Sequence, residues 1–311
     1  MWHGHLTEVR QEYAQFVTTI ARFEPVHLLL RDQEARATAE QALADVKGVT
    51  FHDIALDDVW LRDNGPIFVK DSKGEIRATN WEFNSWGRKY EWDNDNLVPP
   101  FVTSQLKVSR YDIPVVMEGG SLEINGRGAC ITTEQCLLTD TRNPRTGKPE
   151  LEKILRDHLG FTQVIWLHLG LEGDHTDGHI DTITRFSDET TILTSMTGDT
   201  SDINHDRMKH NLAILKAART LQGEAFKVIE LPLPAARMFL EDGTRLPATY
   251  ANFYICNGAV IVPQYDDVND GKALDVIRAC FPKHEVIGLA SRYIITGGGS
   301  FHCLTQQQPQ A

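Results

Sequence analysis

A cysteine near the C-terminus is the strongest candidate for covalent chemistry. Cys303 follows His302 and stands behind three consecutive glycines, Gly297–Gly299. Glycines let the backbone approach a ligand closely or adopt positive φ, and a cysteine on such a loop can be a nucleophile where its thiolate is favoured. The alternative is a small buried apolar residue, as most free cysteines are. The remaining cysteines fall in strand or helix patterns and are expected in the core: Cys130, Cys136, Cys256 and Cys280.

The densest polar segment is GDHTDGHIDTITRF, residues 173–186. In a strand, His179 and Asp181 would point to the same face. A histidine in that place suits proton transfer beside a carboxylate that binds a cation. Two further interpretations stay open on the residues alone. His175, His179 and Asp181 could hold zinc, which the spacing favours, or the segment could be a polar turn with Asp177-Gly178 at its tip.

Two more carboxylates stand beside glycines. In WLRDNGPIF, Trp60 comes three residues before Asp63. A planar guanidinium pairs with a carboxylate through two hydrogen bonds and stacks on aromatic rings, so this pair could bind one. The alternative for Asp63 is a turn capped by its own side chain. Glu118 precedes Gly119-Gly120, and we interpret it as support for that turn.

Composition restricts the class of protein. The 311 residues carry a net charge of −12, which disfavours nucleic-acid binding and suits a cationic small molecule. The five cysteines include no Cys-x-x-Cys pair, so neither a disulfide framework nor a zinc ribbon is indicated. We expect no signal peptide and no membrane helix, and hence a cytoplasmic protein.

The secondary-structure elements that position these residues are of two kinds. Before residue 60, alternating helices and strands predict an α/β protein, and after residue 60 a unit of strands and a helix repeats. Helices are expected at 5–22 and 34–47, and strands at 26–30 and 49–56. Four β-hairpins then follow at 65–81, 119–133, 178–195 and 252–263, turning at sites such as Asn125-Gly126 and Asn257-Gly258. Further helices are predicted at Leu151–Leu159, Asp202–Gln222 and Lys272–Cys280.

A fifth unit is predicted to open with a hairpin at Gly297–Thr305 that the chain does not complete. Five similar units suggest a closed ring, because closure removes free sheet edges. Equivalent positions of a ring meet at its axis. The residues expected to meet there are Asp63, Glu118, His179, Asp181, Asn252 and Cys303.

Six segments between about residues 60 and 309 resemble, in order, the agmatine deiminase and bacterial-type peptidylarginine deiminase family. They are WLRDNGPIFV, FNSWGRKY, EGGSLEING, TTEQCLLTDTRNP, GDHTDGHIDT and GGGSFHCLTQQQP. The resemblance implies the fold of the guanidine-modifying superfamily, a five-bladed α/β-propeller with pseudo-five-fold symmetry, here as a single domain over residues 1–311. It also implies that no metal or cofactor is needed.

The resemblance further implies a role for each candidate. Cys303 would be the nucleophile and His179 the general acid and base, while Asp63 and Asp181 would hold the guanidinium. The pocket that binds the substrate would also be lined by Trp60, Asn252, Glu118, Gly298 and Gly299. The expected reaction converts agmatine and water to N-carbamoylputrescine and ammonia.

Two features depart from the family pattern. Family members usually begin with a strand before the first helix, so we expect the N-terminal strand of the ring to be missing here. Arg88 replaces a glycine common in agmatine deiminases. This slightly raises the expectation of a substrate with a carboxylate, so peptidylarginine or another guanidino compound is the alternative to agmatine. The residues also leave room for a zinc-dependent hydrolase and for a non-catalytic guanidinium-binding protein. A homo-oligomer is a further expectation.

Overall fold

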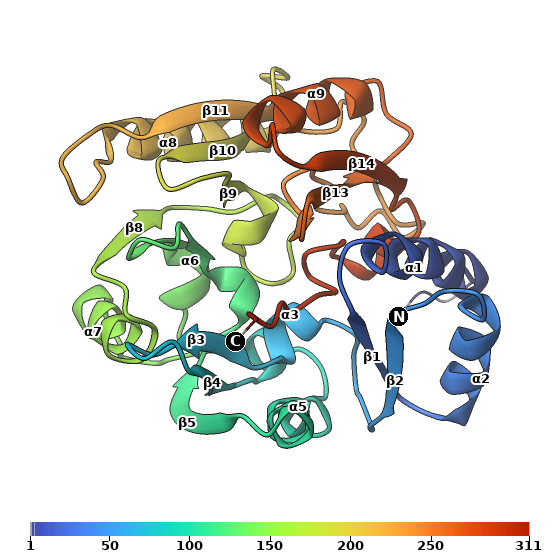
Figure 1. Cartoon of the computed structure of the whole chain (residues 1–311). Helices are drawn as coiled ribbons and strands as arrows, with labels where there is room; N and C mark the ends of the chain where they lie inside the picture. Colours follow the sequence, from blue (N-terminus) through green and yellow to red (C-terminus); the bar gives the residue numbers. More distant parts are fainter. Residues whose placement is uncertain (1, 3, 311) are drawn as a thin grey trace.

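The computed structural model describes residues 2 and 4–310, which form a mixed α/β fold (Figure 1). Five separate sheets surround the middle of the molecule, and the longer helices lie on the outside. The short helix α3 (Leu61–Asn64) and the C-terminal segment lie in the middle. No helix in this described part is long and apolar enough to span a membrane.

Four of the sheets repeat one arrangement of three strands. In each, the first two strands pair antiparallel, and a helix then returns the chain so that the third strand pairs parallel with the second. The four units are β3 (Ile67–Lys70), β4 (Ile76–Glu82), α5 (Val98–Leu106) and β5 (Ser109–Val116); β6 (Glu123–Ile124), β7 (Ala129–Thr133), α7 (Lys148–Leu159) and β8 (Gln163–Leu167); β9 (Thr184–Phe186), β10 (Thr191–Met196), α8 (Ile203–Ala217) and β11 (Lys227–Pro232); and β12 (Tyr254–Cys256), β13 (Ala259–Gln264), α9 (Asp270–Cys280) and β14 (Glu285–Ala290).

The remaining sheet has two parallel strands, β1 (Val26–Leu30) and β2 (Val49–Asp53), joined by α2 (Gln33–Ala42). Among the residues that the structure describes, no antiparallel strand pairs with β1. The predicted hairpin at Gly297–Thr305 is wrong. A 3-10 helix, η4 (Ile294–Gly297), is followed by a turn, and Gly298 has φ of +98°, which strand residues do not adopt.

The sequence explains why these elements form. The middle strands β10 and β13 are almost entirely buried, and they consist mainly of apolar and β-branched residues. On α1 (Leu6–Ile20), Val9, Phe16 and Ile20 recur at helical spacing and pack into the core. The two predicted Asn-Gly turns are formed, with φ of +70° at Gly126 and +79° at Gly258.

Several predicted bounds differ from the structure. The helix expected at 34–47 ends at Ala42, and the strand expected at 49–56 ends at Asp53. The helix expected to reach Gln222 ends at Ala217, because Ala218 is extended and Arg219 pairs with Ala225 in an isolated bridge. The sequence did not indicate α5, since its two consecutive prolines fit only the first turn of a helix.

Candidate active site

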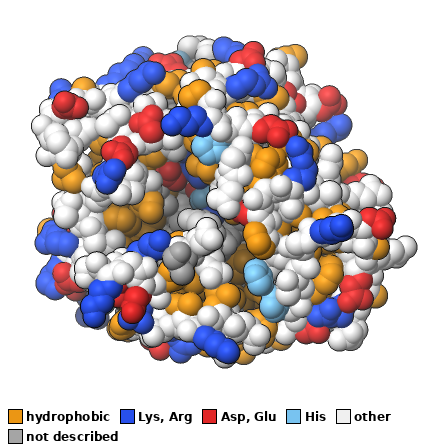
Figure 2. Space-filling view, in the orientation of Figure 1, with side chains coloured by type: hydrophobic (Ala, Val, Ile, Leu, Met, Phe, Trp, Pro, Cys, Tyr) orange, Lys and Arg blue, Asp and Glu red, His pale blue; other side chains and the backbone are white. Residues whose placement is uncertain are grey.

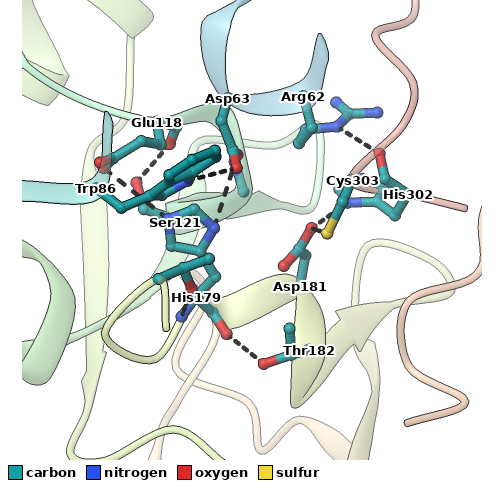
Figure 3. A network of polar contacts seen from close by, with 12 residues as sticks. Arg62, Asp63, Trp86, Glu118, Ser121, His179, Asp181, Thr182, His302 and Cys303 are labelled. Atoms are coloured by element: carbon teal, nitrogen blue, oxygen red, sulfur yellow. Dashed lines mark hydrogen bonds and ion pairs between the residues drawn. The ribbon is translucent and has the colours of Figure 1, made fainter. Parts of the chain in front are cut away.

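Most of the polar residues singled out in the sequence precede the first strand of a unit, and Cys303 lies on the turn after η4. Figure 3 shows Asp63, Glu118, His179, Asp181 and Cys303 gathered in one place. The singled-out residues come from five segments: Asp63 on α3, Glu118 before η2 (Gly119–Ser121), His179 and Asp181 at η3 (Ile180–Thr182), Asn252 before β12, and Cys303 after η4. The predicted convergence of these segments is therefore confirmed.

The sequence predicts a strand for the segment that carries His179 and Asp181, but in the structure this segment is a loop that leads into η3. Asp174 organises this loop, because its carboxylate accepts hydrogen bonds from the backbone of Thr176 and of His179 at 2.9 and 3.1 Å. Thr182 adds a bond of 2.8 Å to the carbonyl of His179. Such side-chain bonds to nearby backbone compete with strand pairing, and β9 starts only at Thr184.

The Cys303 thiol is enclosed by polar groups. The Asn252 amide donates to Sγ at 3.2 Å, and Sγ lies 3.6 Å from Oδ2 of Asp181. The carbonyl oxygen of Asn252's side chain also accepts from the backbone of Ser300 and His302, at 3.2 and 3.1 Å, which fixes the turn. Burial, with the nearby Asp181 and Asp63 charges, raises the pKa of the Cys303 thiol well above its ordinary value. The thiol is thus protonated when the site holds no cation.

The His179 imidazole lies between two carboxylates. Its Nδ1 is 3.6 Å from Oδ1 of Asp63, and its Nε2 is 3.9 Å from Oε2 of Glu118. Burial by itself lowers the pKa of His179, but Asp63, Cys136 and Glu118 outweigh burial and hold the pKa well above its ordinary value. The resting ring is therefore an imidazolium, which can donate a proton.

The two candidate guanidinium-binding carboxylates have different surroundings. Asp63 accepts from the indole of Trp86 at 2.9 Å and from the backbone of Gly120 at 3.0 Å. Asp181 Oδ2 pairs with the His302 ring at 2.6 Å, whereas its Oδ1 is buried with no partner in the described part of the chain. Burial raises the pKa of Asp63 and raises that of Asp181 to about 7.

The sequence suggests that Glu118 supports a turn. In the structure it does more than this, because its carboxylate faces inward. The fully buried Arg142 donates Nε to both carboxylate oxygens, at 2.8 and 3.0 Å. Burial raises the pKa of Glu118, but Arg142 and His179 outweigh it, so the pKa is lowered. Arg142 also donates to Asp177 at 2.8 Å and to the Thr176 carbonyl at 2.6 Å, which ties Glu118 to the loop before His179.

The site is closed. Cys303 and Asp63 are each 4% exposed, and His179 and Asp181 are 0% exposed. Gly299 brings the backbone against Trp60, since an added Cβ would lie 2.8 Å from the indole and 3.1 Å from the Cys303 sulfur. On the outside, the surface is hollowed near its middle (Figure 2), where a groove of about 2660 Å³ reaches His175 and Gly298.

Comparisons with known proteins agree with this geometry. The family model of the Porphyromonas-type peptidyl-arginine deiminases matches residues 1–309. The chain belongs to this family. It is 36% identical to an agmatine deiminase of Stutzerimonas stutzeri over 330 residues, which cover 99% of this chain and 89% of that protein. It is 37% identical to an agmatine deiminase of Pseudomonas syringae, over 93% of this chain and 84% of that protein.

Solved structures of the family are similar over the whole chain. The C315S variant of the C. jejuni agmatine deiminase, with substrate bound, superposes with a TM-score of 0.91 at 34% identity, covering 98% of this chain and 88% of that chain. The agmatine deiminase of Enterococcus faecalis gives a TM-score of 0.93 at 30% identity, covering 99% and 89%.

Three residues of the site were not predicted from the sequence. Trp86, Arg142 and His302 contact Asp63, Glu118 and Asp181 respectively. All three stand in segments that resemble the family, which was the available signal. Single residues inside such segments could not be assigned, because their partners lie between 23 and 121 positions away in the sequence.

The zinc set of His175, His179 and Asp181 does not form. Across the residues described, the group with ligand atoms close enough for a metal ion is Glu118, Cys136 and His179, within 4.8 Å. The Arg142 guanidinium already pairs with both Glu118 oxygens. A dication would have to displace this buried cation or be repelled by it, so the contacts favour an ion-pair cluster of Arg142, Glu118 and His179.

We expect Arg142→Met to lower the free energy of unfolding by about 3–5 kcal/mol, because it leaves the buried Glu118 carboxylate without its partner. Denaturant unfolding followed by circular dichroism measures this change. The control is Lys148→Met, which breaks the partly exposed pair with Glu134 and should cost under about 1 kcal/mol. Equal losses in the two variants would contradict the expectation.

Proposed function

We propose that this chain hydrolyses agmatine to N-carbamoylputrescine and ammonia through a covalent adduct on Cys303. The observation that carries the proposal is one closed centre with a thiol, an imidazolium and two carboxylates. The agmatine deiminases that the chain resembles over nearly its full length support the choice of substrate. The enzyme class is that of hydrolases acting on the C–N bonds of linear amidines.

The guanidinium is held by Asp63 and Asp181. The unpaired Oδ1 of Asp181 accepts one N–H group, and Asp63 accepts another. Trp60, beside the Cys303 sulfur across Gly299, offers an aromatic face to the planar cation. Asn252 positions the thiol through its amide, 3.2 Å from Sγ.

Binding of the cation prepares the nucleophile. Burial and the charges of Asp181 and Asp63 keep the thiol protonated in the free site. The guanidinium offsets the two charges, so the pKa of Cys303 falls when substrate binds. The thiol releases its proton to solvent as the cation binds, and the resulting thiolate attacks the guanidinium carbon and forms the C–S bond. His179 gives its proton to the departing nitrogen, and the C–N bond breaks with release of ammonia.

Water completes the cycle. It attacks the carbon of the S-alkylthiouronium adduct while the neutral His179 accepts its proton. The C–S bond breaks, the thiol of Cys303 is restored, and the ureido product leaves. Asp63 and Glu118, the latter held by Arg142, favour the protonated ring from which the first proton is given and to which His179 returns. This scheme requires no metal and no cofactor.

For the fold, we infer that residues 1–311 form a single domain, a five-bladed α/β-propeller whose axis passes through the site. The support is the four units of equal strand order, the related β1–β2 unit, and the position of the site residues at the starts of units. A cytoplasmic location and a homo-oligomer stay predictions from the sequence.

Substrate affinity should depend on pH through Asp181. Because the pKa of this carboxyl is about 7 in the free site, its cation-binding form is lost as pH falls below 7. In Cys303→Ser, which removes the titrating thiol, agmatine affinity is expected to fall about tenfold per pH unit below 7 and to be constant above it. Calorimetric titrations from pH 5 to 9 measure this, and a constant affinity down to pH 5 would contradict it.

An ammonia assay with agmatine, free arginine and a peptide ending in arginine tests the substrate. Agmatine is expected to give the highest kcat/KM by orders of magnitude, because a carboxylate would be buried without a partner. Arg88 is exposed and forms no ion pair in the described part of the chain, so Arg88→Gly should leave the preference unchanged. If arginine or the peptide gave a higher kcat/KM than agmatine, that compound would be the substrate, and the proposed deiminase chemistry would be unchanged.

A further inference from the structure

We infer that His302 is a positioning residue, whose ring holds Asp181 with one carboxylate oxygen directed toward the substrate. The inference rests on the proposed function, since it assigns a task within the same site. His302 is 6% exposed, and its Nδ1 lies 2.6 Å from Oδ2 of Asp181. Figure 3 shows the pair beside the Cys303 sulfur.

The hydrogen bonds of Asp181 leave it dependent on His302. Within the described residues, the other side-chain contact of this carboxylate is the Cys303 thiol at 3.6 Å, a long and weak donor. The backbone of His302 is fixed independently, because its N–H donates to Asn252 and its carbonyl accepts from Arg62 Nε at 3.4 Å. A fixed ring bound to one oxygen sets the direction of the other.

The state of the ring fits a donor. Burial, with the Arg185 and Arg62 charges, holds the pKa of His302 well below its ordinary value, so the ring is neutral. A neutral ring with its proton on Nδ1 donates to Asp181 and favours the ionised carboxylate. The charged groups that face Asp181 are His179, Asp63, Arg185 and Arg62. Arg185 is already paired with Glu123 at 2.8 Å.

The arrangement also couples two functions. The nucleophile and the residue that orients the guanidinium-binding carboxylate are neighbours, Cys303 and His302, on one turn. A displacement of this turn therefore moves the thiol and the carboxylate together. The distance between the attacking sulfur and the bound carbon is preserved in that way.

Two substitutions separate the donor from the bulk of the ring. His302→Asn keeps an N–H donor at the same number of bonds from Cα, whereas His302→Leu keeps an apolar side chain of similar size without a donor. Both are made in the Cys303→Ser background, and agmatine binding is measured by calorimetry between pH 5 and 9. If the Leu variant lacks the unfolding transition of its parent, His302→Ala, which also has no donor, replaces it with the same expectation.

The Leu variant should weaken agmatine binding about 10- to 100-fold at pH 7, as expected for loss of a hydrogen bond to a charged group. The affinity of the Leu variant for agmatine should approach that of the parent only at higher pH, because Asp181 without its hydrogen-bond donor ionises at a higher pH. The Asn variant should stay within about threefold of the parent at every pH. Equal affinities in the parent and the Leu variant would overturn the inference, and so would equal losses in the Asn and Leu variants without a pH shift.

A second measurement does not depend on agmatine. With Cys303 intact, a cationic haloacetamidine should alkylate the Leu variant more slowly than the wild type, relative to a neutral haloacetamide of similar size. An unchanged ratio would count against His302. Ammonia release from agmatine by the wild type tests the proposed function separately, so failure of one is distinguishable from failure of the other.

Discussion

Cys303→Ala is expected to reduce kcat to below about 1% of the wild-type value, because removal of a covalent nucleophile typically costs far more than this. No other thiol can replace it. The Cys303 thiol contacts Asn252 and Asp181, whereas the thiols of Cys130 and Cys256 donate to the backbone carbonyls of Ile131 and Ala259, and Cys280 lies at the end of α9. Ammonia release under saturating agmatine is the measurement.

Two controls accompany this variant. Its thermal unfolding should match that of the wild type, since the thiol contributes only a few contacts at the turn. Cys280→Ala, which changes a partly exposed cysteine at the end of α9, should retain full activity. If Cys303→Ala kept more than about 1% of kcat, a covalent adduct on this residue would be excluded. Labelling by a haloacetamidine should likewise be fastest at Cys303.

Asp63→Asn and Asp181→Asn are each expected to lower kcat/KM for agmatine by at least about 100-fold. Each removes a charge-assisted pair with the guanidinium in a buried site. At Asp63 the loss has a second cause. Both of its oxygens accept hydrogen bonds, from Trp86 and from the backbone of Gly120, so an amide nitrogen would face one of these donors.

Steady-state kinetics with agmatine checks both variants, with Asp275→Asn as the control. Asp275 lies on α9, and its carboxylate pairs with Arg278 at the surface, so its replacement should leave kcat/KM unchanged. Near-normal kinetics for either active-site variant would remove that aspartate from guanidinium binding. A larger effect on KM than on kcat would locate its contribution in the ground-state complex.

The repeating unit is well predicted by the sequence because its signals are local. Asn125-Gly126 and Asn257-Gly258 mark hairpins through turn geometry alone, and the structure has both. Near the C-terminus the same kind of signal is misleading. Gly297–Gly299 resembles the opening of another hairpin, but in the folded chain these glycines allow close contact with the rings of His175 and Trp60.

The members of the site can be predicted more readily than the residues that support them. Chemically distinctive residues such as Cys303 and His179 are identified from their type and setting. Arg142 is not, because a buried arginine looks like a surface one until its partner Glu118 is known. His302 escapes prediction for a similar reason, since its partner Asp181 is 121 positions away.

The distribution of the site along the chain has a consequence for folding. Its members stand at positions 63, 118, 179, 252 and 303, so their contacts close loops of about fifty residues or more. Such long-range contacts slow folding, because chain entropy is lost before they stabilise the structure. A partly folded chain therefore holds Cys303 as an ordinary thiol, and the reactive centre is assembled only when the units carrying Asp63 and Asp181 have met the turn that follows η4.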